Sequence, residues 1–129
     1  MRLLLDTHVW LWMLTAPERL GAARQPLDDP DNELLLSAAS SWEIAIKYHS
    51  GRLPLPTPPA QYVPESIRSS GVTPLPVHHA HALAVTALPA HHRDPFDRLL
   101  IAQAQLEGAT LVTADPVMGA YDVELLRVS

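Results

Sequence analysis

The chain has 129 residues, 47% of them hydrophobic, so it can bury a sizeable core and is not disordered. It has no cysteine, which excludes disulfides and thiolate metal sites, and no apolar run approaches the roughly 20 residues that cross a bilayer. The net charge of -5 means that any contact with nucleic acid depends on a local patch, a bound cation or a basic partner. We expect one domain over residues 1–129, without a signal peptide, in the cytoplasm.

The first predicted element is a strand over residues 2–5. The leucines Leu3–Leu5 are consecutive and cannot alternate between a buried and an exposed face, so they predict a strand buried on both sides, as in a parallel sheet covered by helices. Asp6 follows, where ligands sit in open α/β sheets, although Asp is also a favoured helix N-cap. Residues 8–14 are apolar nearly all round and predict a short, largely buried helix capped by Thr7 or Asp6.

A second strand and helix follow an irregular stretch. Residues 17–32 contain glycine, proline and turn-forming acids, and they predict a short or irregular helix followed by a loop. Residues 33–37 predict another buried strand, and a helix follows to about residue 50. Glu43 and Lys47 are four residues apart on that helix, which is the spacing of a surface ion pair.

The middle of the chain is rich in proline. Residues 52–59 predict an extended connector, and residues 60–70 predict a helix that Pro64 interrupts. Residues 72–77 form an edge strand at best, because proline cannot donate to a strand ladder.

Three histidines crowd the start of the next helix, which we expect to run to Leu88. They are His78, His79 and His81. No further ligand accompanies them at the spacing of a zinc site, so we interpret them as a polar helix start.

The best-formed predicted helix has Asp94 as its N-cap and ends at Gly108. Asp97 lies in its first turn, where the helix dipole favours an anion. Residues 110–113 predict a further buried strand, which again leads to an acid, Asp115. Residues 125–128 can form a last edge strand.

Alternating strands and helices predict an α/β fold with a mostly parallel sheet of four to five strands. If the strands that lead to acids are neighbours, four carboxylates converge on one cleft: those of Asp6, Glu43, Asp97 and Asp115. Like charges so close raise one another's pKa, and Mg²⁺ or Mn²⁺ would relieve the repulsion because both prefer oxygen ligands. Two ions about 4 Å apart would align a water and a leaving oxygen across a phosphodiester.

Four motifs together resemble PIN-domain proteins, specifically the VapC-like ribonuclease toxins of type II toxin–antitoxin modules. They are LLLDTH (3–8), SSWEIAIK (40–47), DPFDRLLIAQA (94–104) and LVTAD (111–115). The resemblance covers nearly the whole chain and implies a three-layer α/β/α fold. It also implies an endoribonuclease that leaves 5′-phosphate and 3′-hydroxyl ends, with one or two Mg²⁺ or Mn²⁺ ions held by Asp6, Glu43, Asp97 and Asp115. Asp94 and Thr113 would support the site, and Arg98 or Lys47 would contact the scissile phosphate.

The same resemblance implies two protein partners and no membrane. One is a second copy of the chain, and the other is a cognate VapB-like antitoxin that lays a peptide across an apolar groove. We expect Trp10, Trp12 and Trp42 to contribute to such surfaces. Substituting Trp12 with alanine is then expected to weaken antitoxin binding.

Two other functions stay open. One is a PIN-like binding module without catalysis, against which the presence of all four acids argues. The other is a phosphatase that uses Asp6 as a covalent nucleophile. That chemistry needs a second aspartate two residues on, where this chain has His8.

Overall fold

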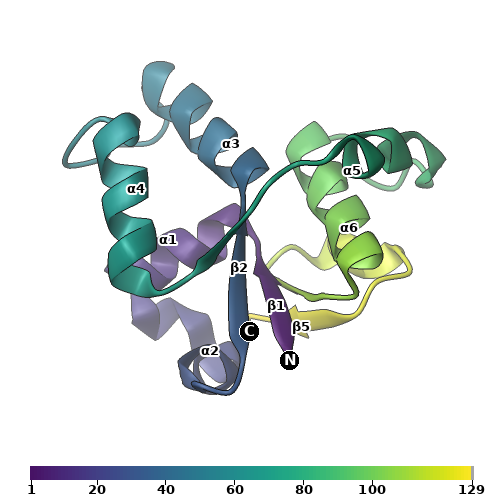
Figure 1. Cartoon of the computed structure of the whole chain (residues 1–129), viewed down its shortest axis with the longest axis horizontal. Coiled ribbons are helices and arrows are strands. Elements are labelled where there is room, and N and C mark those ends of the chain that lie inside the picture. The colour runs from purple at the N-terminus through teal and green to yellow at the C-terminus, as the bar shows by residue number, and fades with distance from the viewer. Residues whose placement is uncertain (129) are drawn as a thin grey trace.

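The computed structural model describes residues 1–128, and within them five strands form one sheet in which every pair of neighbours is parallel. The strand order is β3-β2-β1-β4-β5 (Figure 1). The strands are β1 (Arg2–Leu5), β2 (Glu33–Ser37), β3 (Thr73–Leu75), β4 (Thr110–Thr113) and β5 (Leu125–Arg127). The predicted α/β fold is therefore confirmed, and the sheet is wholly rather than mostly parallel.

Helices cover both faces of this sheet. The α-helices are α1 (Thr7–Thr15), α2 (Arg24–Asp28), α3 (Ala38–His49), α4 (Pro59–Ser70), α5 (His79–Ala84) and α6 (Pro95–Glu107). Short 3₁₀ segments complete the chain: η1 (Pro17–Ala23), η2 (Val85–Ala87) and η3 (Pro116–Ala120). None of the helices in residues 1–128 is both long and apolar enough to cross a membrane.

The central strand β1 explains the run of leucines. Leu3 and Leu5 point into the core formed with α1, α3 and α4, whereas Leu4 points into the core formed with α6 and η3. All three side chains are completely buried. Each contributes on the order of 1.5–3 kcal/mol through burial, so the run pins β1 between two helical layers. This is the three-layer arrangement that the sequence predicted.

The proline-rich middle departs from the prediction at Pro64. Helix α4 runs without interruption from Pro59 to Ser70. Pro64 is its sixth residue, so only the hydrogen bond to the carbonyl of Ala60 is lost. The helix buries Val63 against the core, and this packing outweighs the missing bond.

The ends of the other predicted elements shift slightly. The helix that begins after His78 ends at Ala84, and η2 continues the chain to Ala87 as a separate segment. The two edge strands, β3 and β5, are short as predicted, and β3 accommodates Pro74 at the edge of the sheet.

The three tryptophans have different environments. Trp10 is completely buried, and its Nε1 donates to Ser70 Oγ at 3.2 Å, so the prediction that it contributes to a binding surface is wrong. Trp12 is partly buried, and the guanidinium of Arg19 lies 4.3 Å from its ring centroid. Trp42 is 63% exposed and meets the ring of Phe96 edge-on.

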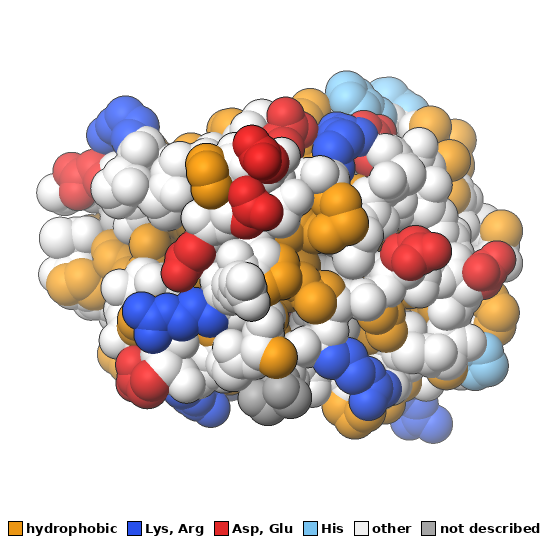
Figure 2. Space-filling view, turned by 90° about the horizontal axis from the view of Figure 1, so that it is seen from below, with side chains coloured by type: hydrophobic (Ala, Val, Ile, Leu, Met, Phe, Trp, Pro, Cys, Tyr) orange, Lys and Arg blue, Asp and Glu red, His pale blue; other side chains and the backbone are white. Residues whose placement is uncertain are grey.

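The two ends of the sheet differ in character. The N-terminus lies at the lower end of β1 in Figure 1, so the carboxyl ends of the parallel strands point upward. Figure 2 views the molecule from below, at the amino ends of the strands. On that face, among the described residues, the basic side chains (blue) stand apart from one another between acids and apolar patches. The acids predicted to carry chemistry follow the opposite ends of the strands.

Candidate functional site

An acidic pocket of about 340 Å³ lies at the carboxyl ends of β1 and β4. Because β1 is hydrogen-bonded to both β2 and β4, residues that follow these three strands meet at one edge of the sheet. The structure brings all four predicted acids into this pocket. Its lining includes Asp6, Glu43, Lys47, Asp94, Asp97 and Asp115.

Asp6 follows β1 and occupies the N-cap position of α1. Within the described residues, its side chain makes no capping hydrogen bond. It accepts instead from Thr113 Oγ1, with 2.7 Å between Oγ1 and Oδ2. Burial raises the pKa of Asp6, the hydrogen bond from Thr113 opposes that rise, and the charge of Glu43 adds to it. The Asp6 carboxylate is thus held by β4 and faces the pocket rather than its own helix.

Glu43 enters from α3 and is buried. Its Oε1 accepts from Thr7 Oγ1 at 2.6 Å, and its Oε2 lies 2.6 Å from Lys47 Nζ. The predicted ion pair with Lys47 therefore exists, but it faces the pocket and not the outer surface. Thr7 was considered only as a helix cap in the sequence. Its position next to Asp6 is the signal that would have placed it in the site.

Asp97 enters from the first turn of α6. Asp94 caps that helix as predicted, and its Oδ1 accepts from the backbone amides of Phe96 at 2.8 Å and Asp97 at 3.2 Å. Burial raises the pKa of Asp97 to about 7, and the charges of Asp6 and Asp94 add to the rise. Asp97 therefore holds its proton to a clearly higher pH than an ordinary aspartate does.

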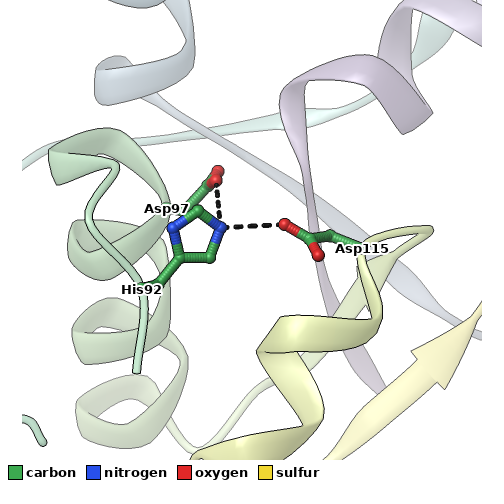
Figure 3. Close-up of side chains that lie close together, drawn as sticks. All are labelled: His92, Asp97 and Asp115. Atoms are coloured by element: carbon green, nitrogen blue, oxygen red, sulfur yellow. Dashed lines mark hydrogen bonds and ion pairs between the residues drawn. The ribbon is translucent and has the colours of Figure 1, made fainter. Parts of the chain in front are cut away.

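Asp115 lines the pocket, and His92 lies next to it. Asp115 Oδ1 accepts from the amide of Val117 at 2.9 Å, and Oδ2 lies 2.8 Å from His92 Nε2. The same Nε2 lies 3.1 Å from Asp97 Oδ2, so the imidazole stands between the two carboxylates (Figure 3). Burial would raise the pKa of Asp115, but the hydrogen bonds with His92 and the Val117 amide, together with the charge of His92, lower that pKa.

His92 is, after Thr7, the second residue of this site that the sequence did not reveal. It lies in a loop, next to His91, and no repeated spacing marks it as a ligand or a base. The signal was its position two residues before Asp94, the N-cap of α6, because the backbone amide of Asp94 donates to His92 Nδ1. Ligand atoms of His92, Asp97 and Asp115 all lie within 4.8 Å of one another.

The pocket has the chemistry of a site for a hard divalent cation. Its carboxylate oxygens come from Asp6, Glu43, Asp97 and Asp115, and oxygen ligands are those that Mg²⁺ and Mn²⁺ prefer. Besides burial, the charges of Asp6, Asp94 and Glu43 raise the pKa of Asp97, and the charge of His92 opposes them only in part. A cation in the pocket would complete the neutralisation of these charges, so the residues present fit the group.

The histidines that crowd the start of α5 lie elsewhere. His81 is buried, its Nε2 lies 2.9 Å from Glu107 Oε2, and its Nδ1 accepts from the amide of His78. The cluster identified among residues 1–128 as able to hold a metal ion does not include them. The interpretation as a polar helix start therefore needs one correction, since His81 ties α5 to α6 inside the protein.

Arg98 has a different role from the phosphate contact predicted for it. Its guanidinium is directed away from the pocket, into the loop that precedes α6. It donates to backbone carbonyls and one hydroxyl there, namely those of Val85 (3.0 Å), Leu88 (3.4 Å), Pro89 (2.9 Å) and His92 (3.4 Å), and the hydroxyl of Tyr121 (3.4 Å). Arg98 thus holds together the segment that carries His92.

Replacing Arg98 with alanine is expected to lower the free energy of unfolding by about 1–3 kcal/mol, since several partly buried carbonyls lose their donor. It should also speed proteolysis of the segment 85–93. Urea denaturation and limited proteolysis measure both effects. Arg93 is exposed and makes none of these bonds, so Arg93→Ala is the matched control. Equal results for the two variants would contradict the role given to Arg98.

Comparison with known proteins places this geometry in a family. The PIN domain family matches residues 3–124. The chain is 35% identical over 116 residues to Ribonuclease VapC22 of Mycobacterium tuberculosis, covering 87% of this chain and 85% of that relative. It is 50% identical over 66 residues to Ribonuclease VapC16 of the same organism, where the match spans 51% of this chain and about half, 47%, of the relative.

A solved structure supports the same fold. The crystal structure of VapBC2 from Rickettsia felis, bound to a DNA fragment from their promoter, contains a chain that superposes with a TM-score of 0.75. The superposition covers 100% of both chains at 15% sequence identity. The match over residues 3–124, the VapC22 relative and the acidic pocket at the carboxyl edge of a parallel sheet agree: this chain belongs to the PIN-domain family.

Proposed function

We propose that this chain is a metal-dependent endoribonuclease and the toxin of a type II toxin–antitoxin system. The observation that carries the proposal is the meeting of four carboxylates from separate elements in one pocket of a PIN fold. The two relatives described above are named as ribonucleases, and the solved structure is a VapBC complex. In this proposal the protein cleaves RNA in the cytoplasm.

In this proposal Asp6, Glu43, Asp97 and Asp115 would hold one or two Mg²⁺ or Mn²⁺ ions. When bound, such an ion would supply Lewis-acid chemistry for the attack of water on phosphorus. The chain contributes the positioning: Thr113 fixes the Asp6 carboxylate and Thr7 fixes that of Glu43.

The bond changes follow from hydrolysis of a phosphodiester. A bond forms between the water oxygen and phosphorus, and the bond from phosphorus to the 3′-oxygen breaks. The water loses a proton and the 3′-oxygen gains one, which leaves 5′-phosphate and 3′-hydroxyl ends. Lys47 is the lysine of the pocket lining, and its partly exposed ammonium can turn from Glu43 toward a phosphate oxygen.

The proposal includes a second copy of the chain and an antitoxin as partners. An apolar groove of about 580 Å³ runs between α3 and α4 and is lined by side chains that include Val63, Pro64 and Ile67. This groove is where we expect an antitoxin peptide to lie. Trp12 lines the acidic pocket itself, so Trp12→Ala remains a test for a partner that enters the site.

The test is cleavage of total cellular RNA by the purified protein with Mg²⁺ or Mn²⁺. Discrete fragments with 5′-phosphate ends are expected, and both EDTA and Asp6→Asn should remove them. Asp31→Asn changes an exposed acid in a loop and should leave cleavage intact. Cleavage that survives EDTA or Asp6→Asn would refute the proposal.

The same assay separates the two other functions. A binding module without catalysis would release no fragments from any RNA and need not bind Mn²⁺ in the pocket, so a Mn²⁺ titration accompanies the assay. A phosphatase that uses Asp6 would hydrolyse a small phosphomonoester and leave RNA whole. Asp6 is followed two residues later by the exposed His8, so the general acid that such a phosphatase needs is missing at that position.

Thr113→Val is expected to weaken Mn²⁺ binding by about 10–100-fold, as loss of a group that orients a metal ligand commonly does. The valine keeps the shape of a completely buried side chain but removes the hydrogen bond to Asp6 Oδ2 and the acceptor for the amide of Asp115. Calorimetric titration with Mn²⁺ measures the change. Thr15→Val, at an exposed threonine in the last turn of α1, is the control. Unchanged affinity in Thr113→Val would contradict this role.

A further inference from the structure

The imidazole of His92 lies between Asp97 and Asp115, where it could either bind the cation or orient the two acids. We propose that His92 is a positioning residue: its Nε2–H holds Asp97 and Asp115 in place, and the ring does not ligate the metal. The inference rests on the proposed function, because it concerns the same pocket. It assigns a role to His92, which is not one of the four acids of the proposed metal site.

The first step is the position of the ring proton. The backbone amide of Asp94 donates to His92 Nδ1, with 3.1 Å between the two nitrogens. A neutral imidazole whose Nδ1 accepts a hydrogen bond carries its proton on Nε2. In an imidazolium both nitrogens carry protons, and the contact with Asp94 would then be lost. In either form, Nε2 has a proton and therefore no free lone pair for a metal ion.

The second step is what that proton contacts. Nε2 lies 2.8 Å from Asp115 Oδ2 and 3.1 Å from Asp97 Oδ2, and one N–H can be shared between two such acceptors (Figure 3). The two acids come from different elements, since Asp97 is on α6 and Asp115 follows β4. A carboxylate oxygen has two lone pairs, so each acid can still accept a cation while it is held.

The third step is that the ring itself is fixed. The amide of His92 donates to Tyr121 Oη at 2.7 Å, and the carbonyl of His92 accepts from Arg98. The Tyr121 side chain is buried. These contacts fix the backbone of His92, and the bond from the Asp94 amide to Nδ1 fixes its ring, before any cation or substrate arrives, which is the arrangement expected of a group that orients ligands.

The alternative is that His92 supplies a nitrogen ligand. The ligand atoms of His92, Asp97 and Asp115 are close enough for that. It would require Nε2 to lose its proton, and then Nδ1 would have to carry one. An Nδ1–H would face the N–H of Asp94, so two donors would oppose each other. The hydrogen-bond pattern around the ring therefore favours the positioning role.

The test uses two substitutions, each of which places an amide nitrogen at the position of one of the two imidazole nitrogens. The amide nitrogen of glutamine in His92→Gln reaches the place of Nε2 and restores the donor, whereas asparagine in His92→Asn reaches only the place of Nδ1. Mn²⁺ affinity within about 3-fold of the unmodified protein is expected for His92→Gln, and a loss of about 10-fold or more for His92→Asn. Thermal unfolding of both variants verifies that they fold.

Two spectroscopic measurements complete the test. Long-range ¹⁵N–¹H spectra of the metal-free protein should show His92 with its proton on Nε2. Electron spin-echo spectra of bound Mn²⁺ should show no coupling to an imidazole nitrogen of His92. The spectra of the unmodified protein and of His92→Gln should therefore show the same nitrogen couplings. A coupling that disappears in His92→Gln, a neutral His92 protonated on Nδ1, or full Mn²⁺ affinity in His92→Asn would each overturn the inference. Failure of the unmodified protein to bind Mn²⁺ or to cut RNA would instead overturn the proposed function.

Discussion

Replacing Asp97 with asparagine is expected to lower RNA cleavage by at least about 100-fold and, at the same time, to stabilise the metal-free protein at pH 8. The loss of cleavage follows from removing a charge that a preorganised site directs at the reaction, which commonly costs about 10²–10³-fold. The gain in stability follows from the position of Asp97 in the pocket. Burial and the charges of Asp6 and Asp94 raise its pKa to about 7.

The sign of the stability effect follows from proton binding. The unfolded chain releases the Asp97 proton near its ordinary pKa of 3.8, and the folded protein releases it near 7. Stability from this group is therefore full below the lower value and is lost as the pH rises through the higher one. Asparagine carries no charge and avoids that loss, so we expect a gain of about 1–3 kcal/mol at pH 8, reduced from the full shift because water and His92 partly screen the carboxylate.

Two measurements check this prediction. Urea denaturation without metal at pH 5 and pH 8 should show a gain for Asp97→Asn that is clearly larger at pH 8, because the loss begins above the unfolded pKa of 3.8 and is complete only above about 7. RNA cleavage with Mn²⁺ should be nearly lost in the same variant. Asp31→Asn, at an exposed acid in the loop before β2, should change neither quantity. A variant that is less stable at pH 8, or that cuts RNA normally, would contradict the account of Asp97.

The second large effect is expected in the core. Trp10→Ala should lower the free energy of unfolding by about 3–5 kcal/mol, which is the usual cost of truncating a buried aromatic side chain. Trp10 is completely buried in the layer that joins α1 to the sheet and to α4, and the change also removes the hydrogen bond to Ser70.

The control for Trp10 is another tryptophan. Trp42 is 63% exposed and is in contact with the ring of Phe96, so Trp42→Ala should cost less than about 1.5 kcal/mol. Urea denaturation followed by circular dichroism measures both variants without relying on tryptophan fluorescence. Equal losses for the two substitutions would contradict the burial assigned to Trp10.

The parts of the fold that the sequence predicted are those that depend on local pattern. Three leucines in a row can be buried only if both faces of the strand are covered, and Leu3–Leu5 are covered in this way. Acids that follow parallel strands must share one edge of the sheet, and Asp6 and Asp115 do so. The cap at Asp94 is local as well, since its partners are two and three residues away.

The parts that the sequence did not predict depend on contacts between distant segments. His92 acquires its place from Asp115, which is 23 residues away, and Arg98 binds carbonyls whose positions depend on the path of a loop. Pro64 was expected to break a helix, but packing of that helix outweighed the local rule. The different environments of Trp10 and Trp12 do not depend on distant contacts and could have been predicted. Helical periodicity places residues two apart on nearly opposite sides of a helix, and so separates a core residue from one nearer the surface.

Mn²⁺ binding to the unmodified protein and to Asp6→Asn, measured by calorimetry at pH 6 and pH 8, tests the central claim most directly. The claim is that carboxylates from separate elements form one divalent-metal site. Mn²⁺ should bind the unmodified protein about 10-fold more weakly at pH 6 than at pH 8, because it must displace the proton that Asp97 holds up to a pKa of about 7. Asp6→Asn should bind weakly at both pH values. The absence of Mn²⁺ binding at pH 8, or equal affinity in Asp6→Asn, would contradict the claim.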